Sequence, residues 1–243
     1  GVLMKLGAFG IIRIGVELCP EGARFWLPYF SVFTLVNITY GAFSAMSQVD
    51  LKYVIAYSSV SHMGIVILGI CTLNDAGLNG AVLQMFSHGI MTGMFFALVG
   101  FTYEKTHTRM IAEYGGLGAK MPVIATFFTI AGLASLGLPG LSGFVAEFMV
   151  FLGAWQMNRV MCAIAAVGIV VTAAYVLRVL QKCFWGPLTN PHYDEITDAS
   201  PVQILCLTIL ASVLVAVGML PGWLVSIINS GVGPVLARVA GGG

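Results

Sequence analysis

The sequence predicts an all-α fold, a polytopic transmembrane helical bundle, and three observations support this prediction. Hydrophobic residues make up 58% of the 243 residues, charged residues only 9%, and the mean hydropathy is +0.95. Soluble domains contain roughly 25% charged residues, so 11 basic and 10 acidic side chains are too few to cover a soluble surface of this size. The apolar residues also occur in runs of the ~20 residues that a helix needs to cross a bilayer, and not in the ~10-residue alternating segments of a membrane β-barrel.

The net charge and the cysteines narrow the classes of function. A net charge of +1 provides no basic stripe for phosphates, so we expect no nucleic-acid partner. The five cysteines lie scattered, mostly in apolar runs, and no CxxC, CxxH or HExxH spacing occurs. Zinc, iron–sulfur and haem sites lack their ligand pattern, so we expect no metal site. The expected environment is the lipid bilayer.

Polar or Pro/Gly-rich stretches divide the chain into about seven expected helices within a single transmembrane domain. The first run begins at Gly1 without a basic leader, so we expect a fragment that begins inside a helix. A loop is predicted over 186–191, and His107 and His192 are predicted to lie in loops. The expected spans are 1–18, 26–48, 53–73, 78–101, 122–155, 160–185 and 201–229.

The run over 122–155 is too long for one straight span. Its ~34 residues would reach about 50 Å as a helix, against ~30 Å of hydrocarbon. Pro139 lies within Gly137-Leu138-Pro139-Gly140-Leu141-Ser142-Gly143, where proline removes a backbone donor and glycine relaxes the helix. We expect a broken helix near Pro139, a feature that marks ion and substrate sites in transporters. A hairpin loop between two short helices is the alternative.

The distribution of Lys and Arg predicts the orientation in the membrane. Cytoplasmic loops carry an excess of these residues. The loops after the second, fourth and sixth spans and the adjoining helix ends hold Lys52, Lys105, Arg109, Lys120, Arg178 and Lys182. The opposite side holds Arg13, Arg24, Arg159 and Arg238. The larger set is expected to be cytoplasmic, which places the C-terminus on the outer side.

Four ionisable residues fall inside the apolar runs, where a charge costs roughly 2.5–3.5 kcal/mol at the bilayer centre. Glu147 is the only acid away from the end of a predicted span, and it follows the Pro139 break by about two turns. Lys5 lies among small and apolar residues near the start of the chain. A carboxyl or amine buried in this way can exchange its proton near neutral pH. The alternatives are a permanent structural ion pair for Glu147 and a snorkelling side chain for Lys5.

His62 and His88 are the other two ionisable residues inside the apolar runs. Ser58 and Ser61 precede His62 at i−4 and i−1, and Gln84 and Thr92 flank His88 at i−4 and i+4. Each histidine therefore belongs to a polar stripe on an otherwise apolar helix. We favour proton transfer for both, although a membrane histidine also serves as a helix–helix hydrogen-bond partner.

Several motifs resemble the antiporter-like M subunit of respiratory complex I, called chain 4 in mitochondrial naming. The resemblance covers essentially the whole chain and weakens after about Pro187. The motifs that carry it are Asp50-Leu51-Lys52, Ile55 to Gly64, Val2 to Ala8, Gln84 to Gly89, Tyr103 to Arg109, Gly115-Gly116-Leu117 and Leu138 to Phe148.

The resemblance implies a fourteen-helix fold with two inverted five-helix repeats, of which this chain holds helices eight to fourteen. Residues 1–18 would be the last helix of the first repeat, 26–185 the second repeat, and 201–243 the closing helix and tail. Lys5 matches the helix-eight lysine of the family, and His62 and His88 match its central histidines. Glu147 matches the acid on the second broken helix, where L, N and cation/proton antiporter subunits usually carry Lys.

The implied function is a proton-translocating membrane subunit of an NADH (or ferredoxin):quinone oxidoreductase, with protons moving along Lys5, His62 and His88 to Glu147. No cofactor is expected in this chain, and quinone, flavin and iron–sulfur clusters are expected in partner subunits. The implied partners are L-type and N-type neighbours and the absent first half. The membrane is expected to be a bacterial plasma membrane, with the thylakoid as the alternative. The rival functions are an Mrp-type cation/proton antiporter subunit and a passive structural element.

Overall fold

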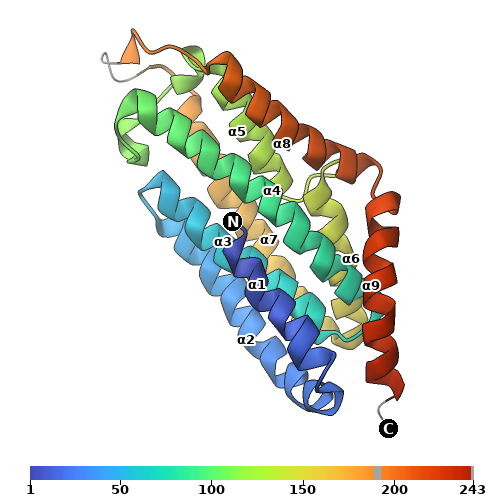
Figure 1. Ribbon diagram of the computed structural model, residues 1–243. Helices are drawn as coiled ribbons and strands as arrows, with labels where there is room; N and C mark the ends of the chain where they lie inside the picture. The colour runs from blue at the N-terminus through green and yellow to red at the C-terminus, as the bar shows by residue number, and fades with distance from the viewer. Residues whose placement is uncertain (189–192, 242–243) are drawn as a thin grey trace.

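The computed structural model describes residues 1–188 and 193–241, and this part of the chain folds into helices without a β-strand. Six of the helices are long and apolar enough to cross a membrane. The prediction of an all-α transmembrane bundle is therefore confirmed (Figure 1).

The described residues form nine α-helices and three short helices of other types. The α-helices are α1 (Leu3–Gly10), α2 (Pro20–Ser47), α3 (Leu51–Cys71), α4 (Asp75–Thr106), α5 (Pro122–Ser135), α6 (Ser142–Met157), α7 (Arg159–Phe184), α8 (Pro201–Met219) and α9 (Gly222–Gly241). A π-helix, η1 (Ile11–Val16), continues α1, and two 3-10 turns, η2 (Ile111–Glu113) and η3 (Leu117–Ala119), lie between α4 and α5.

Polar side chains mark where several helices begin, because they satisfy backbone N–H groups that have no partner within the helix. Asp50 accepts from the Lys52 N–H before α3, and Asn74 accepts from the Gly77 N–H before α4, both at 2.8 Å. Ser200 and Gln203 form a reciprocal capping box at α8. These caps place the polar ends of the helices outside the apolar spans.

The broken helix near Pro139 is present. The run over 122–155 consists of α5 and α6, separated by a short irregular segment. Gly137 and Gly140 have φ values of +68° and +95°, and only glycine adopts this conformation without strain. The irregular segment packs against the end of α8, since a Cβ at Gly140 would lie 3.6 Å from the sulfur of Met219 and a Cβ at Gly218 would meet the Leu141 backbone at 2.5 Å.

Other predicted boundaries require correction. The single span expected over 201–229 is wrong, because α8 ends at Met219 and α9 begins at Gly222, after Pro221. Proline cannot supply the N–H that a continuous helix needs. The helix expected over 1–18 changes from α to π geometry after Gly10. The loop predicted over 186–191 is described only to residue 188, and His192 lies outside the described residues.

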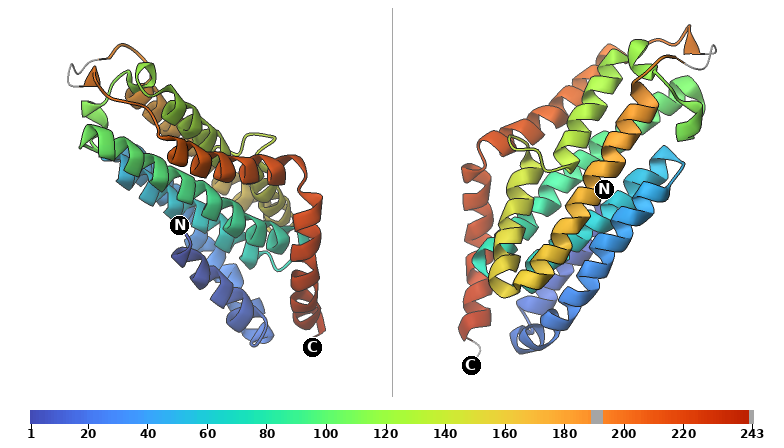
Figure 2. Two further views of the ribbon diagram at one scale, coloured as in Figure 1. Left: turned by 45° about the horizontal axis from the view of Figure 1, so that its top comes forward. Right: turned by 180° about the vertical axis from the view of Figure 1, so that it is seen from behind.

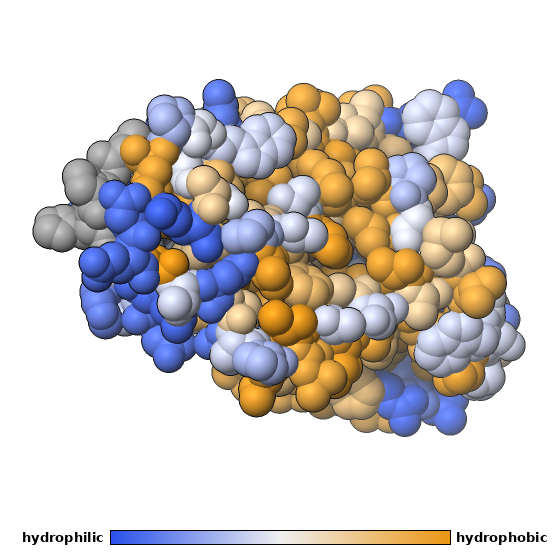
Figure 3. Space-filling view, turned by 90° about the horizontal axis from the view of Figure 1, so that it is seen from above, coloured by the Kyte–Doolittle hydropathy of each residue, from blue (hydrophilic) through white to orange (hydrophobic). Residues whose placement is uncertain are grey.

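The long helix α4 lies at the centre of the bundle. It packs against α3, α5, α6, α8 and α9, and Figure 2 shows α8 and α9 following one side of the molecule while α2 lies on the other. Seen from above, hydrophilic residues gather mainly at one end of the molecule, smaller hydrophilic groups lie toward the other end, and apolar residues cover much of the face between them (Figure 3). The arrangement leaves α3, α4 and α6 facing one another in the interior.

Close approach of α4 and α6 depends on Gly80. A Cβ at this position would lie 2.7 Å from the backbone nitrogen of Val150 and 3.0 Å from the carbonyl oxygen of Ala146, so the two backbones must separate to admit it. We expect Gly80→Ala to lower the free energy of unfolding in detergent by about 1–3 kcal/mol. Gly89→Ala on the same helix is the control, because its Cβ would meet nothing within 4 Å. Equal stability of the two variants would contradict this packing.

Candidate functional site

The broken helix brings the carboxyl group of Glu147 into the interior. Glu147 lies in the second turn of α6 and is 5% exposed. Its Oε1 accepts a hydrogen bond from the side-chain amide of Gln84 on α4 at 3.2 Å and lies 3.1 Å from His62 Nδ1 on α3. Three helices therefore converge on one carboxyl oxygen.

The other carboxyl oxygen faces the break. A Cβ at Gly137 would lie 2.9 Å from Glu147 Oε2, so the absence of a side chain there leaves room for the carboxyl group. A cavity of about 250 Å³ adjoins this position and is lined by Glu147, Gly137 and Phe144 among others. The two oxygens of Glu147 thus have different surroundings, one hydrogen-bonded and one beside open space.

His62 joins both halves of the broken helix. Its ring is buried, with Nδ1 directed at Glu147 on α6 and Nε2 at the hydroxyl of Ser135, the last residue of α5, at 3.0 Å. When Glu147 is ionised, Nδ1–H donates to the carboxylate, and Nε2 then accepts from the Ser135 hydroxyl. The imidazole is therefore a bridge across the break, with a defined partner on each side.

His88 continues the row toward α1. Its ring centroid lies 5.3 Å from that of His62, and its Nδ1 lies 2.6 Å from the ammonium nitrogen of Lys5. Lys5 is partly buried, and its ammonium group also donates to the carbonyl of Gly1. His88 Nε2 is buried and has no hydrogen-bond partner among the described residues, so this nitrogen is the open point of the row.

All four predicted residues therefore lie together, in the order Lys5, His88, His62 and Glu147. The order predicted for the two histidines is wrong, because His88 contacts Lys5 and His62 contacts Glu147. The row carries an ammonium group at one end and a carboxyl group at the other, with two imidazoles between them. Neutral imidazole both donates and accepts a hydrogen bond, so each ring can take up a proton at one nitrogen and release one at the other.

The polar stripes predicted around the histidines are satisfied mostly by the backbone. Ser58 donates to Ile55 O on its own helix, Ser61 donates to Ile38 O on α2, and Thr92 donates to His88 O. Gln84 is the exception, since its amide reaches Glu147. Helix periodicity places residues on a common face, but it does not decide between a side-chain partner and a backbone partner.

Sequence reasoning missed three serines at the site. Ser135 contacts His62, and the hydroxyls of Ser87 on α4 and Ser142 at the start of α6 lie 2.6 Å apart. Ser135 and Ser142 lie immediately before and after the irregular segment that contains Pro139. A hydroxyl on either side of a predicted helix break is the signal that would have identified two of the three.

No cluster of three or more His, Cys, Asp or Glu side chains that could hold a metal ion occurs within residues 1–188 and 193–241. The five cysteines are free thiols, and three of them are buried.

The fold and the site together define a polytopic membrane protein with a row of buried and partly buried titratable groups at a broken helix. A family profile described as NADH:quinone oxidoreductase/Mrp antiporter, transmembrane, matches residues 1–172. The chain belongs to this family, and the expected resemblance is confirmed.

Curated relatives match over nearly the whole chain. NADH-quinone oxidoreductase subunit M of Rickettsia conorii is 38% identical over 238 residues, which cover 98% of this chain and 48% of the relative. The chloroplastic NAD(P)H-quinone oxidoreductase chain 4 of Marchantia polymorpha is 40% identical over 246 residues, covering 98% of this chain and 49% of that protein. The chain thus spans about half the length of the curated relatives it matches.

Solved structures share the fold of this chain. A chain of respiratory complex I from Thermus thermophilus with bound NADH superimposes with a TM-score of 0.92 at 31% identity, covering 99% of this chain and 50% of that one. A chain of the Mrp complex from Dietzia superimposes with a TM-score of 0.86 over 97% of this chain and 51% of that one. The second match, at 18% identity, shows a shared fold only.

The Ser87–Ser142 hydrogen bond is expected to hold the start of α6 against α4. A double-mutant cycle with Ser87→Ala and Ser142→Ala should give a coupling energy of about 0.6 kcal/mol, the average for interhelical hydrogen bonds in membrane proteins. The free energy of unfolding in bicelles is the measurement. A cycle that pairs Ser87→Ala with Ser230→Ala, an exposed position on α9, is the control and should give no coupling. Additive effects at Ser87 and Ser142 would contradict the contact.

Proposed function

We propose that the chain is part of a proton-translocating membrane subunit of a complex I-like NADH (or ferredoxin):quinone oxidoreductase. The observation that carries this proposal is the row Lys5–His88–His62–Glu147, which is partly buried at Lys5, buried at the other three residues, and ends on a broken helix. Membership of the family and the names of the relatives, subunit M and chain 4, support the assignment to this type of complex. The chain would act as a non-redox subunit of a translocating enzyme.

In the proposed mechanism, protons pass from group to group along the row. Lys5 Nζ releases a proton to His88 Nδ1 across their 2.6 Å contact. The proton on His88 Nε2 then crosses to His62 by way of a water molecule or a ring reorientation. His62 releases its Nδ1 proton to Glu147 Oε1, 3.1 Å away. At each step one N–H or O–H bond breaks as another forms, so only the positions of the protons change.

Charge at one end of the row influences the other through the low-dielectric interior. Interactions between charges are stronger there than in water. Loss of the Lys5 proton removes a positive charge beside His88, and gain of a proton at Glu147 removes a negative charge beside His62. Quinone reduction in another subunit would drive translocation by altering charge near one end of this row. Coupled groups of this kind share their titration rather than titrating independently.

The proposed partners and location follow the same assignment. Residues 1–18 would close the first repeat, 26–185 would form the second, and 201–243 would form the closing element. L-type and N-type subunits and the other half of the subunit would adjoin it in the bilayer. Quinone, flavin and iron–sulfur clusters would reside in partner subunits, with none bound by this chain. A bacterial plasma membrane with the C-terminus outside is favoured, and a thylakoid is the alternative.

The test is neutralisation of the acid in the assembled complex. Glu147→Gln preserves the shape and polarity of the side chain but removes the site that accepts a proton. We expect the number of protons pumped per quinone reduced to fall while the complex still assembles, since removal of a positioned proton-transfer group typically slows transfer by about 10²–10⁴-fold. Glu113→Gln, at an exposed position, is the control and should leave pumping unchanged.

The rival functions give different outcomes. Unchanged pumping in Glu147→Gln would support a structural role for the row and would overturn the proposal. Exchange that requires Na⁺ in reconstituted vesicles would instead support an Mrp-type antiporter subunit. Lys5→Gln should also lower the number of protons pumped, because it removes the group that delivers protons to His88 Nδ1.

A further inference from the structure

We propose that the small cavity beside Tyr175 holds a bound water molecule, and that this water opens a second proton path into the row at His62, independent of Lys5. This inference rests on the proposed function. It concerns a buried tyrosine and a cavity that the mechanism above does not use, on the opposite side of His62 from Glu147.

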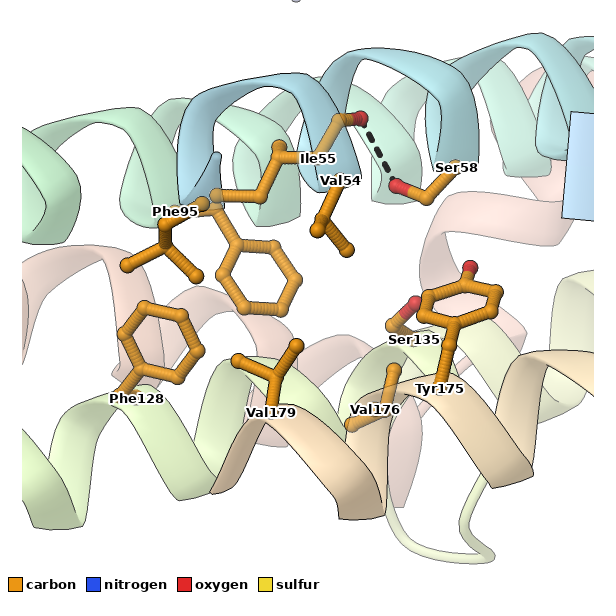
Figure 4. A pocket seen from close by; sticks show the side chains of 10 residues that line it. Val54, Ile55, Ser58, Phe95, Phe128, Ser135, Tyr175, Val176 and Val179 are labelled. Atoms are coloured by element: carbon orange, nitrogen blue, oxygen red, sulfur yellow. Dashed lines mark hydrogen bonds between the residues drawn. The ribbon is translucent and has the colours of Figure 1, made fainter. Parts of the chain in front are cut away.

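The cavity is large enough for one water molecule, and three hydroxyl-bearing side chains that could bind it line one end. It offers about 20 Å³ to the centre of a water-sized sphere, whereas one bound water requires roughly 10–15 Å³ and two to four polar partners. Its polar lining consists of Ser58, Ser135 and Tyr175, from three different helices. Figure 4 shows the Tyr175 hydroxyl pointing toward α3, the helix that carries Ser58, with Ser135 beside the tyrosine ring.

The Tyr175 hydroxyl lacks the partner that a buried polar group requires. Tyr175 is 2% exposed, and its hydroxyl has no hydrogen-bond partner among the described residues. An unsatisfied buried hydroxyl costs roughly the desolvation free energy of that group. Ser58 uses its proton on Ile55 O, 2.8 Å away, so its oxygen remains able to accept. A water between Tyr175, Ser58 and Ser135 satisfies the orphaned hydroxyl.

This water would connect directly to the row. Ser135 Oγ lies 3.0 Å from His62 Nε2, and His62 Nδ1 lies 3.1 Å from Glu147 Oε1. An extra proton that arrives at the water passes to Ser135 Oγ while Ser135 releases its own proton to His62 Nε2. His62 in turn releases its Nδ1 proton to Glu147. One proton enters, one reaches the carboxylate, and the water and the serine regain their original form.

The apolar part of the cavity lining would control the entry of water and protons from the polar loop. From Ser58 it follows one face of α3, past Ile55 and Val54 to Leu51, the first residue of the helix. That end lies at the polar loop, where Asp50 pairs with Arg109. The stretch between is apolar and includes Phe95 and Phe128, whose ring centroids are 5.2 Å apart. Hydrophobic constrictions of this kind gate pores by losing their water, so the path would conduct only when this stretch is hydrated.

Tyr175→Phe tests the inference, because it removes only the hydroxyl. In the assembled complex whose full-length subunit also carries Lys5→Gln, which closes the first path, we expect proton transfer into Glu147 to slow by about three- to tenfold, the kinetic equivalent of one hydrogen bond. The readout is the rate at which the infrared band of protonated Glu147 appears after quinone reduction begins, a signal that a purely structural tyrosine would not affect. Tyr53→Phe is the matched control, because it removes the same hydroxyl at an exposed position on α3. It should leave the rate unchanged.

A second measurement keeps the inference falsifiable if Tyr175→Phe impairs assembly. A cryo-electron microscopy map of the unmodified complex that resolves bound water should show density between Tyr175, Ser58 and Ser135. A dry cavity in such a map, or an unchanged rate in assembled Tyr175→Phe, would overturn the inference. If Glu147→Gln abolishes pumping while either of these results is obtained, the proposed function stands and only the second path fails.

Discussion

The bridge made by His62 is the interaction on which the rest of the site depends. A break in a membrane helix exposes backbone and side-chain polar groups that lipid cannot satisfy, and this imidazole contacts both sides of the break, at Ser135 and at Glu147. The bridge requires α3, α5 and α6 to remain in register. Two further contacts help to hold these helices in place. Gly80 on α4 packs against the backbone of α6, and Gly218 on α8 packs against the break at Gly140.

Some buried polar atoms at the site have hydrogen-bond partners among the described residues, and others do not. Gln84 and His62 serve one oxygen of Glu147, while the other oxygen faces Gly137 and open space. His88 Nε2 and the Tyr175 hydroxyl lack partners among the described residues. Fully paired groups rigidify an interior, whereas groups with a free position can accept water or pass on a proton.

The sequence was sufficient to predict the fold class and the helix break, and to single out four titratable residues that lie together, because each depends on local composition. Hydropathy located the spans, and Pro139 among glycines located the break. The sequence was insufficient to place Ser135, Ser87 and Tyr175 at the site or to give the order of the two histidines, since these depend on which helices face one another. It also merged α8 and α9, because an apolar run does not show where Pro221 turns the chain.

The open space beside Gly137 has a consequence for how this scaffold could be adapted. Lysine is longer than glutamate, and a lysine at position 147 would have the adjoining cavity of about 250 Å³ beside it. The polarity of the terminal group would reverse, and His62 would then face a donor instead of an acceptor. The sign of the charge beside the helix break would then depend on the one residue at position 147 and not on the shape of the bundle.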